Sequence, residues 1–228
     1  MSGHHDERRF TGFGEHAVEF FDGLIADNSK AYWQDNLETY RADVRAPMEA
    51  LLAELEPEFA TGFGTGKVFR PHRDVRFAKD KSPYKTHCGA VIERGRGGGA
   101  YYVQISADGL LVGGGCFRLA TDQLTRFRTA VAGELAGTRL VRILGTLRAK
   151  GWQVEGGKLA TRPRGYPADH PRTELLRHRN IYVTRRWQPD DTLHEPECHG
   201  RVREAWLAVR EFNEWAADHV GPSEEPAR

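Results

Sequence analysis

Residues 101–112 read Tyr-Tyr-Val-Gln-Ile-Ser-Ala-Asp-Gly-Leu-Leu-Val. Tyr101, Val103 and Ile105 alternate with more polar neighbours, and this period of two is typical of a strand with one buried face. The Asp-Gly pair at 108–109 is a strong hairpin signal, because glycine adopts the positive φ that a tight turn requires. The stretch therefore predicts two antiparallel strands joined by a short turn.

The period of two continues on both sides of this hairpin. Further strands are predicted over 68–77, 87–93, 152–159 and 181–187. The first two join the hairpin in a meander of about four antiparallel strands, and a mixed sheet is the alternative once the later strands are added. The triplet Gly113-Gly-Gly115 indicates a bulge or a close approach by another part of the chain.

Helical periodicity flanks the strands. Apolar residues spaced three and four apart predict helix over 15–56, with Ser29 as an internal cap and Pro57 as the stop. Later helices are predicted after Thr121, from a Thr138 cap, over 173–178 and, as a long C-terminal helix, up to Gly221. Helices first, strands next and a mixed second half predict an α+β fold, in which helices cover a largely antiparallel sheet.

The length of 228 residues, without an internal repeat or a Gly/Ser linker, predicts one domain over 1–228, with disordered tails at 1–9 and 223–228. No apolar run reaches the roughly 20 residues of a membrane helix, and no secretory signal is recognisable. We therefore expect a cytoplasmic protein without a membrane partner. The cysteines form no C-x-x-C pair, so inert thiols are expected, with no metal and no cofactor.

The charges are concentrated in one segment. Residues 67–87 hold seven Lys or Arg against two Asp, although the whole chain has a formal net charge of only +1. Guanidinium groups suit phosphate and carboxylate, and an Asp between them can orient one by bidentate pairing. The segment therefore predicts a phosphate or nucleotide site. With one residue of a later loop and one that follows this loop, its expected ligand-binding residues are Arg70, Arg73, Asp74, Arg76, Asp80, Lys81, Tyr84, Lys85, Arg164 and Arg177.

The later loop, 162–172, contains three prolines and is followed by Arg177. We expect it to fold over the mouth of the basic site and to supply further donors or a general acid, His170. The catalytic candidates are then Asp74, Tyr84 and His170. Each residue type also has a common structural role, as a salt-bridge partner, a turn residue or a packed side chain.

The pattern Arg70-x-x-Arg73-Asp74-x-Arg76-Phe77-x-x-Asp80-Lys81-x-x-Tyr84 resembles the signature of the bacterial DUF2461 family. The resemblance extends from about Phe10 to Pro222. It implies one domain of bacterial type and a special role for this segment, and it supplies neither an activity nor catalytic residues.

Three functions fit these residues. The first is binding of an anionic small molecule or nucleotide, including an enzyme that acts on such a substrate. The second is a nucleic-acid-binding module, in which Tyr84, Tyr101 or Tyr102 stacks on bases; the near-neutral total charge argues against it. The third is a non-catalytic interaction protein, in which the Arg/Asp pattern is a structural clamp. The sequence leaves the oligomeric state open.

Overall fold

The computed structural model describes residues 9–60, 64–76, 78–93 and 99–225. Within them, six strands form one sheet in the order β1-β2-β3-β4-β6-β5, and every pairing is antiparallel. The strands are β1 (Gly66–Val68), β2 (His87–Glu93), β3 (Ala100–Ser106), β4 (Gly109–Cys116), β5 (Gln153–Glu155) and β6 (Ile181–Trp187). Together with the helices, this sheet confirms the α+β prediction and settles the choice between an antiparallel and a mixed sheet.

The hairpin of β3 and β4 has the predicted register. Ser106 lies opposite Gly109, and Gly109 has a φ of 87°, which is the conformation that the Asp-Gly signal indicates. The next pairing is not local. Strands β4 and β6 are neighbours in the sheet, although residues 117–180 separate them in the chain.

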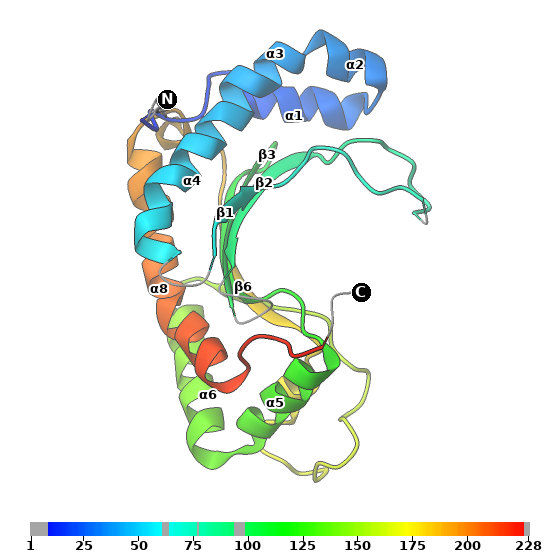
Figure 1. The fold of residues 1–228 in the computed structure, drawn as a ribbon, viewed down its shortest axis with the longest axis vertical. Helices are drawn as coiled ribbons and strands as arrows, with labels where there is room; N and C mark the ends of the chain where they lie inside the picture. Colours follow the sequence, from blue (N-terminus) through cyan, green and yellow to red (C-terminus); the bar gives the residue numbers. More distant parts are fainter. Residues whose placement is uncertain (1–8, 61–63, 77, 94–98, 226–228) are drawn as a thin grey trace, which may run out of the picture.

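The strand predicted over 68–77 is wrong beyond Val68, where β1 ends. The chain then leaves the sheet and returns as a long excursion, residues 69–86, which we call the arm (Figure 1). Its two sides are joined by an isolated bridge between His72 and Tyr84. Pro71 and Pro83 have no N–H to donate, and among the described residues no further strand pairs with the arm, so the ladder does not continue. Phe77 lies outside the described residues.

The helices begin and end close to the predicted positions. They are α1 (Ala17–Ala26), α2 (Lys30–Asp35), α3 (Leu37–Thr39), the π-helix η1 (Tyr40–Arg45), α4 (Ala46–Phe59), α5 (Thr121–Ala132), α6 (Glu134–Ala149), α7 (Thr173–Leu176), the 3-10 helix η2 (Asp191–His194) and α8 (Glu197–His219). The Ser29 cap is confirmed, since its Oγ accepts a 3.1 Å hydrogen bond from the Tyr32 amide. Helices α4 and α8 run along the convex side of the curved sheet, and α5 and α6 lie at one end (Figure 1).

Three boundaries differ from the prediction. Pro57 lies inside α4, where it removes one backbone hydrogen bond, and the helix ends two residues later at Phe59. Thr138 lies inside α6 rather than at its start, and its Oγ is 3.2 Å from the Glu134 carboxylate. The strand predicted over 152–159 is limited to β5.

The two faces of the sheet are chemically different. Tyr101, Val103 and Ile105 are buried against the helices. Helix α8 comes so close to β4 that a Cβ on Gly114 would lie 2.7 Å from Val209 Cγ2, which confirms the close approach predicted from the glycine triplet. Tyr102 and its neighbours on the other face are only partly covered, so the concave face of the sheet is the place to search for a site.

The C-terminal residues 223–225 lie against the start of α5. Asp122 accepts hydrogen bonds from Ser223 Oγ and from the Glu224 amide, both of 2.9 Å. These residues belong to the tail that was expected to be disordered, and the structure gives them defined partners. Residues 1–8 and 226–228 lie outside the described residues. Among the described helices, none combines the length and the apolar character that crossing a bilayer requires.

Candidate functional site

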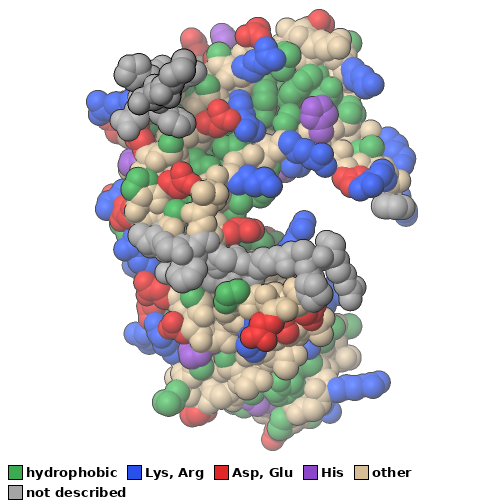
Figure 2. Space-filling model, viewed as in Figure 1, with side chains coloured by type: hydrophobic (Ala, Val, Ile, Leu, Met, Phe, Trp, Pro, Cys, Tyr) green, Lys and Arg blue, Asp and Glu red, His purple; other side chains and the backbone are tan. Residues whose placement is uncertain are grey.

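A cleft of about 900 Å³ occupies the concave face of the sheet. The space-filling view shows this hollow, with Lys and Arg side chains along its upper wall (Figure 2). Its lining comes from strands β2 to β6, from the base of the arm, from the chain after β4 and from residues 223–225. The volume lies within the range of clefts that bind small molecules and cofactors.

Four aromatic side chains form a row along this cleft. The ring centroids of Phe69 and Tyr102 are 6.4 Å apart, and those of Tyr102 and Phe117 are 5.6 Å apart. Phe117 then stacks on Tyr182 at 4.6 Å, with an interplanar angle of 24°. All four side chains are partly exposed and line the cleft, so planar groups of a ligand can pack against them.

One glycine makes room for the row. A Cβ on Gly89 would lie 2.6 Å from the Tyr102 hydroxyl, so the Tyr102 ring lies over a position without a side chain. This explains the glycine inside β2. At Gly113 the backbone is the close neighbour, because a Cβ there would lie 2.8 Å from the Val183 carbonyl oxygen and at an ordinary contact distance of 3.5 Å from Phe117 Cζ.

Cations gather where the arm joins the sheet. Lys85 Nζ donates a 2.9 Å hydrogen bond to the Arg70 carbonyl and lies 5.3 Å from the Phe69 ring centroid. Burial, with the nearby charges of Arg70 and Lys67, lowers the pKa of Lys85. Burial and the Lys85 charge also lower the pKa of His87, so this cleft-lining imidazole is neutral at neutral pH. We call Lys67, Arg70 and Lys85 the cationic end.

Carboxylates lie elsewhere in the cleft. Glu155 on β5 accepts a hydrogen bond from the buried Thr184 hydroxyl, which holds the carboxylate in place. Glu225, Glu93 and Arg118 also line the cleft. The carboxylates of the cleft thus come from β2, β5 and the C-terminal segment, and the cationic end lies beside the lining residue Phe69, just outside the lining itself.

Four further charges of the arm pair with one another. Arg73 binds Asp80, and Arg76 binds Asp74 through two hydrogen bonds of 3.0 and 2.7 Å. Hydrogen bonds from Ser82 and Arg73 hold the pKa of Asp80 well below its usual range, and Arg76 lowers the pKa of Asp74. None of these four arm residues lines the cleft. Lys81 also stays within the arm, where its Nζ donates to the Val75 carbonyl at 3.0 Å. These contacts favour a structural role for this part of the pattern.

Tyr84 anchors the arm. Its side chain is 5% exposed and stacks on Trp33, with centroids 4.3 Å apart and rings 10° from parallel. Asn28 binds both backbone groups of Tyr84, at 3.1 and 3.0 Å. The ring on which a base was expected to stack therefore packs against the N-terminal helices, and Tyr101 is buried as well.

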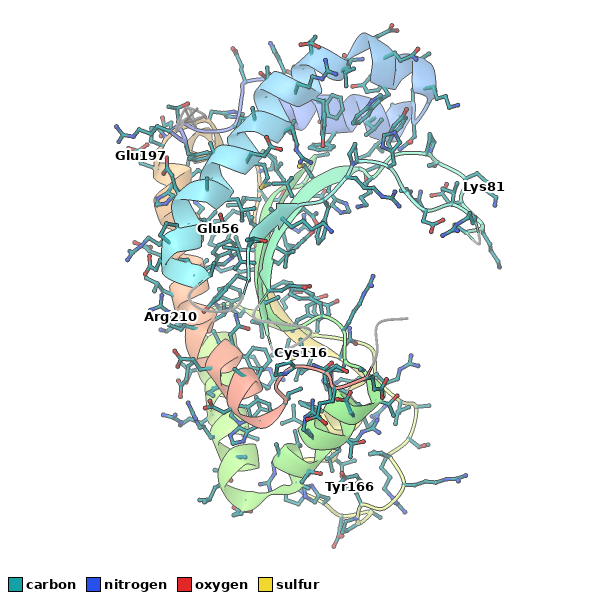
Figure 3. All side chains as sticks on the ribbon, in the orientation of Figure 1. Glu56, Lys81, Cys116, Tyr166, Glu197 and Arg210 are labelled. Atoms are coloured by element: carbon teal, nitrogen blue, oxygen red, sulfur yellow. The ribbon has the colours of Figure 1, made fainter. Side chains whose placement is uncertain are left out.

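The expectation that the loop 162–172 folds over the basic site is wrong. Tyr166 of this loop and Lys81 of the arm lie at opposite ends of the molecule (Figure 3). His170 Nδ1 accepts a 3.0 Å hydrogen bond from the Arg172 amide, and Arg177 pairs with Glu174 at 2.7 Å. Arg164 is exposed in the same distant loop. The predicted residues thus fall into two separate groups.

A family model described as "Conserved hypothetical protein (DUF2461)" matches residues 16–215. The chain belongs to the DUF2461 family. The match includes the arm and all six strands, so the cleft of this DUF2461 protein is built almost entirely from the family region. The cleft-lining residues Ser223 and Glu225 follow it. No curated protein matches this chain.

Most of the cleft was not predicted from the sequence. Tyr102 was named as a stacking residue for nucleic acid, and the named cations Lys85 and Arg70 lie beside the lining residue Phe69. The alternation of the strands carried a signal for the cleft. Tyr102 and Gln104 alternate with apolar residues in β3, as Tyr182 and Thr184 do in β6, so aromatic and polar side chains share the face opposite the apolar one.

Proposed function

We propose that this DUF2461 protein binds an anionic small molecule of the nucleotide class in the cleft. The cationic end holds the anionic group, and the aromatic row packs against the planar part. The observation that carries the proposal is the position of Lys85, which lies beside Phe69 at the start of the row. Two of its three ammonium donors remain for a ligand oxygen after the bond to the Arg70 carbonyl.

The charges of the cleft favour a small ligand over a nucleic-acid strand. A strand along the whole aromatic row would bring successive phosphates toward Glu155, Glu93 and Glu225. Like charges at close range cost free energy, and Arg118 is the compensating cation there. A ligand with its phosphates confined to the cationic end avoids this cost.

The test is binding of a nucleotide panel by isothermal titration calorimetry, with thermal unfolding as a second measurement. We expect Lys85→Ala to weaken binding about tenfold or more, because hydrogen bonds to charged groups contribute about 1.5–3 kcal/mol. Arg76→Ala is the matched control, since Arg76 pairs with Asp74 in the arm, whereas Lys85 lies against the cleft-lining ring of Phe69.

Two results would contradict the proposal. Equal losses in Lys85→Ala and Arg76→Ala would move the anion away from Phe69 and the cleft, toward the part of the arm around Arg76. Absence of stabilisation by any nucleotide would remove the proposed function, because a ligand at 100 times its dissociation constant adds about 2.7 kcal/mol to the free energy of unfolding.

A further inference from the structure

We infer that the ligand is longer than a nucleoside monophosphate and ends in a hydroxyl-bearing group, as in a nucleoside diphosphate sugar, and that Glu155 recognises this group. The inference rests on the proposed function and specifies its substrate class. It is carried by the distance between the cationic end, beside the cleft, and Glu155 in the cleft, and by the side chains around Glu155.

The length follows from the sheet. The cationic end joins β2 at the base of the arm, and Glu155 lies on β5, four strand spacings away in the order β2-β3-β4-β6-β5. At about 4.8 Å for each spacing, the separation across the sheet is roughly 19 Å, and the curvature of the sheet shortens the direct path. The aromatic row continues between the two ends, from Phe69 to Tyr182. A ligand that uses the whole row therefore extends well beyond one phosphorylated nucleoside.

The chemistry at the far end suits a sugar. A carboxylate accepts hydrogen bonds from neighbouring hydroxyl groups, as acidic residues do when they bind the ribose of a dinucleotide. Glu155 is fixed by the Thr184 hydroxyl and keeps further acceptor positions on its carboxylate. The stacked pair of Phe117 and Tyr182 lies alongside, and its apolar faces can pack against the C–H face of a sugar ring.

The position of the pair relative to Glu155 supports this assignment. Tyr182 is directly opposite Glu155 in the pairing of β5 with β6, so both side chains project from the same face. Gly115 lies opposite Tyr182 on the other side and Gly113 lies opposite Thr184, so no side chain of β4 fills the space between them. The sheet thus leaves an open volume bordered by an aromatic ring and a positioned carboxylate.

The test compares nucleoside diphosphates with their sugar-bearing forms in calorimetric titrations. The pairs are ADP with ADP-ribose, UDP with UDP-glucose, and UDP with UDP-N-acetylglucosamine. At least one sugar-bearing ligand should bind the wild type about tenfold more tightly than its parent diphosphate, which corresponds to one hydrogen bond to a charged group. Glu155→Gln should abolish most of this gain and leave the affinity for the parent unchanged, because Gln keeps an acceptor for Thr184.

Glu38→Gln is the matched control, since Glu38 pairs with Arg41 on an exposed helix surface. It should bind every ligand as the wild type does. If the diphosphates bind and no attached sugar improves affinity, or if Glu155→Gln weakens both members of a pair equally, this inference is wrong and the proposed function stands. If no member of any pair binds, both fall.

Discussion

Asn28→Ala should release the arm from the N-terminal helices. In the wild type the Asn28 amide donates to the Tyr84 carbonyl at 3.1 Å and accepts from the Tyr84 amide at 3.0 Å. The variant loses both hydrogen bonds and leaves two backbone groups of a buried residue without these partners. A typical hydrogen bond contributes about 1 kcal/mol net, and an unsatisfied buried group costs about 1–3 kcal/mol. We therefore expect the free energy of unfolding to fall by about 2–3 kcal/mol.

The measurement is urea unfolding, followed by intrinsic Trp fluorescence, because Trp33 stacks on Tyr84. Amide hydrogen exchange at Tyr84 should also become faster in the variant. Asn36→Ala is the control, since the Asn36 amide makes one 2.9 Å hydrogen bond, to the Tyr32 carbonyl, and should cost less than half as much. A loss below about 0.5 kcal/mol in Asn28→Ala would refute the anchoring role, as surface substitutions typically stay within that limit.

Gly89→Ala should displace the Tyr102 ring, because the added methyl would lie 2.6 Å from the Tyr102 hydroxyl. Nucleotide binding should weaken, while the free energy of unfolding changes by about 1 kcal/mol. Unaltered nucleotide affinity in calorimetry would contradict the role of the aromatic row. Gly115→Ala should destabilise the fold by about 3 kcal/mol in urea unfolding, since Gly115 has a φ of 121° and the methyl would lie 2.6 Å from Phe212 Cε1. A loss below 1 kcal/mol would show that this strand relaxes freely. The Glu224 amide is the main cause that lowers the pKa of Asp122 to about 2. Because this folded-state pKa is below the unfolded value of about 3.9, the ionised Asp122 stabilises the fold above pH 4, and this stabilisation is lost as the pH falls toward 2. Asp122→Asn should lack this part of the acid dependence, and identical acid unfolding profiles would exclude it.

The sheet was predictable because its signals are local. Alternation in 101–106 and the Asp108-Gly109 turn each determine a hairpin without reference to the rest of the chain. The strand predicted over 68–77 was wrong beyond Val68 because residues 70–76, Arg-Pro-His-Arg-Asp-Val-Arg, do not alternate between apolar and polar side chains. Pairing there also needs free backbone amides, and Pro71 and Pro83 have none.

The candidate site was less predictable because it is assembled from many distant segments. The positive charge of the arm predicted an anion site there. In the structure, Arg73 pairs with Asp80 and Arg76 pairs with Asp74, so these charges are neutralised within the arm. Glu155 is one carboxylate in a chain with 32 acidic residues, and nothing local distinguishes it. Its position becomes meaningful only when β5 pairs with β6, which depends on the tertiary fold.

The pairing of β4 with β6 also determines the order in which the molecule can form. Strands β2, β3 and β4 follow one another in the chain, and the short loops between them close quickly. Strand β6 pairs with β4 only after residues 117–180 have been traversed. During synthesis, β4 therefore emerges with an unpaired edge before its partner exists. An exposed strand edge invites pairing with other chains. Fragments that end before Ile181 should accordingly aggregate, and the half of the cleft that β5 and β6 form should be the last part of the protein to mature.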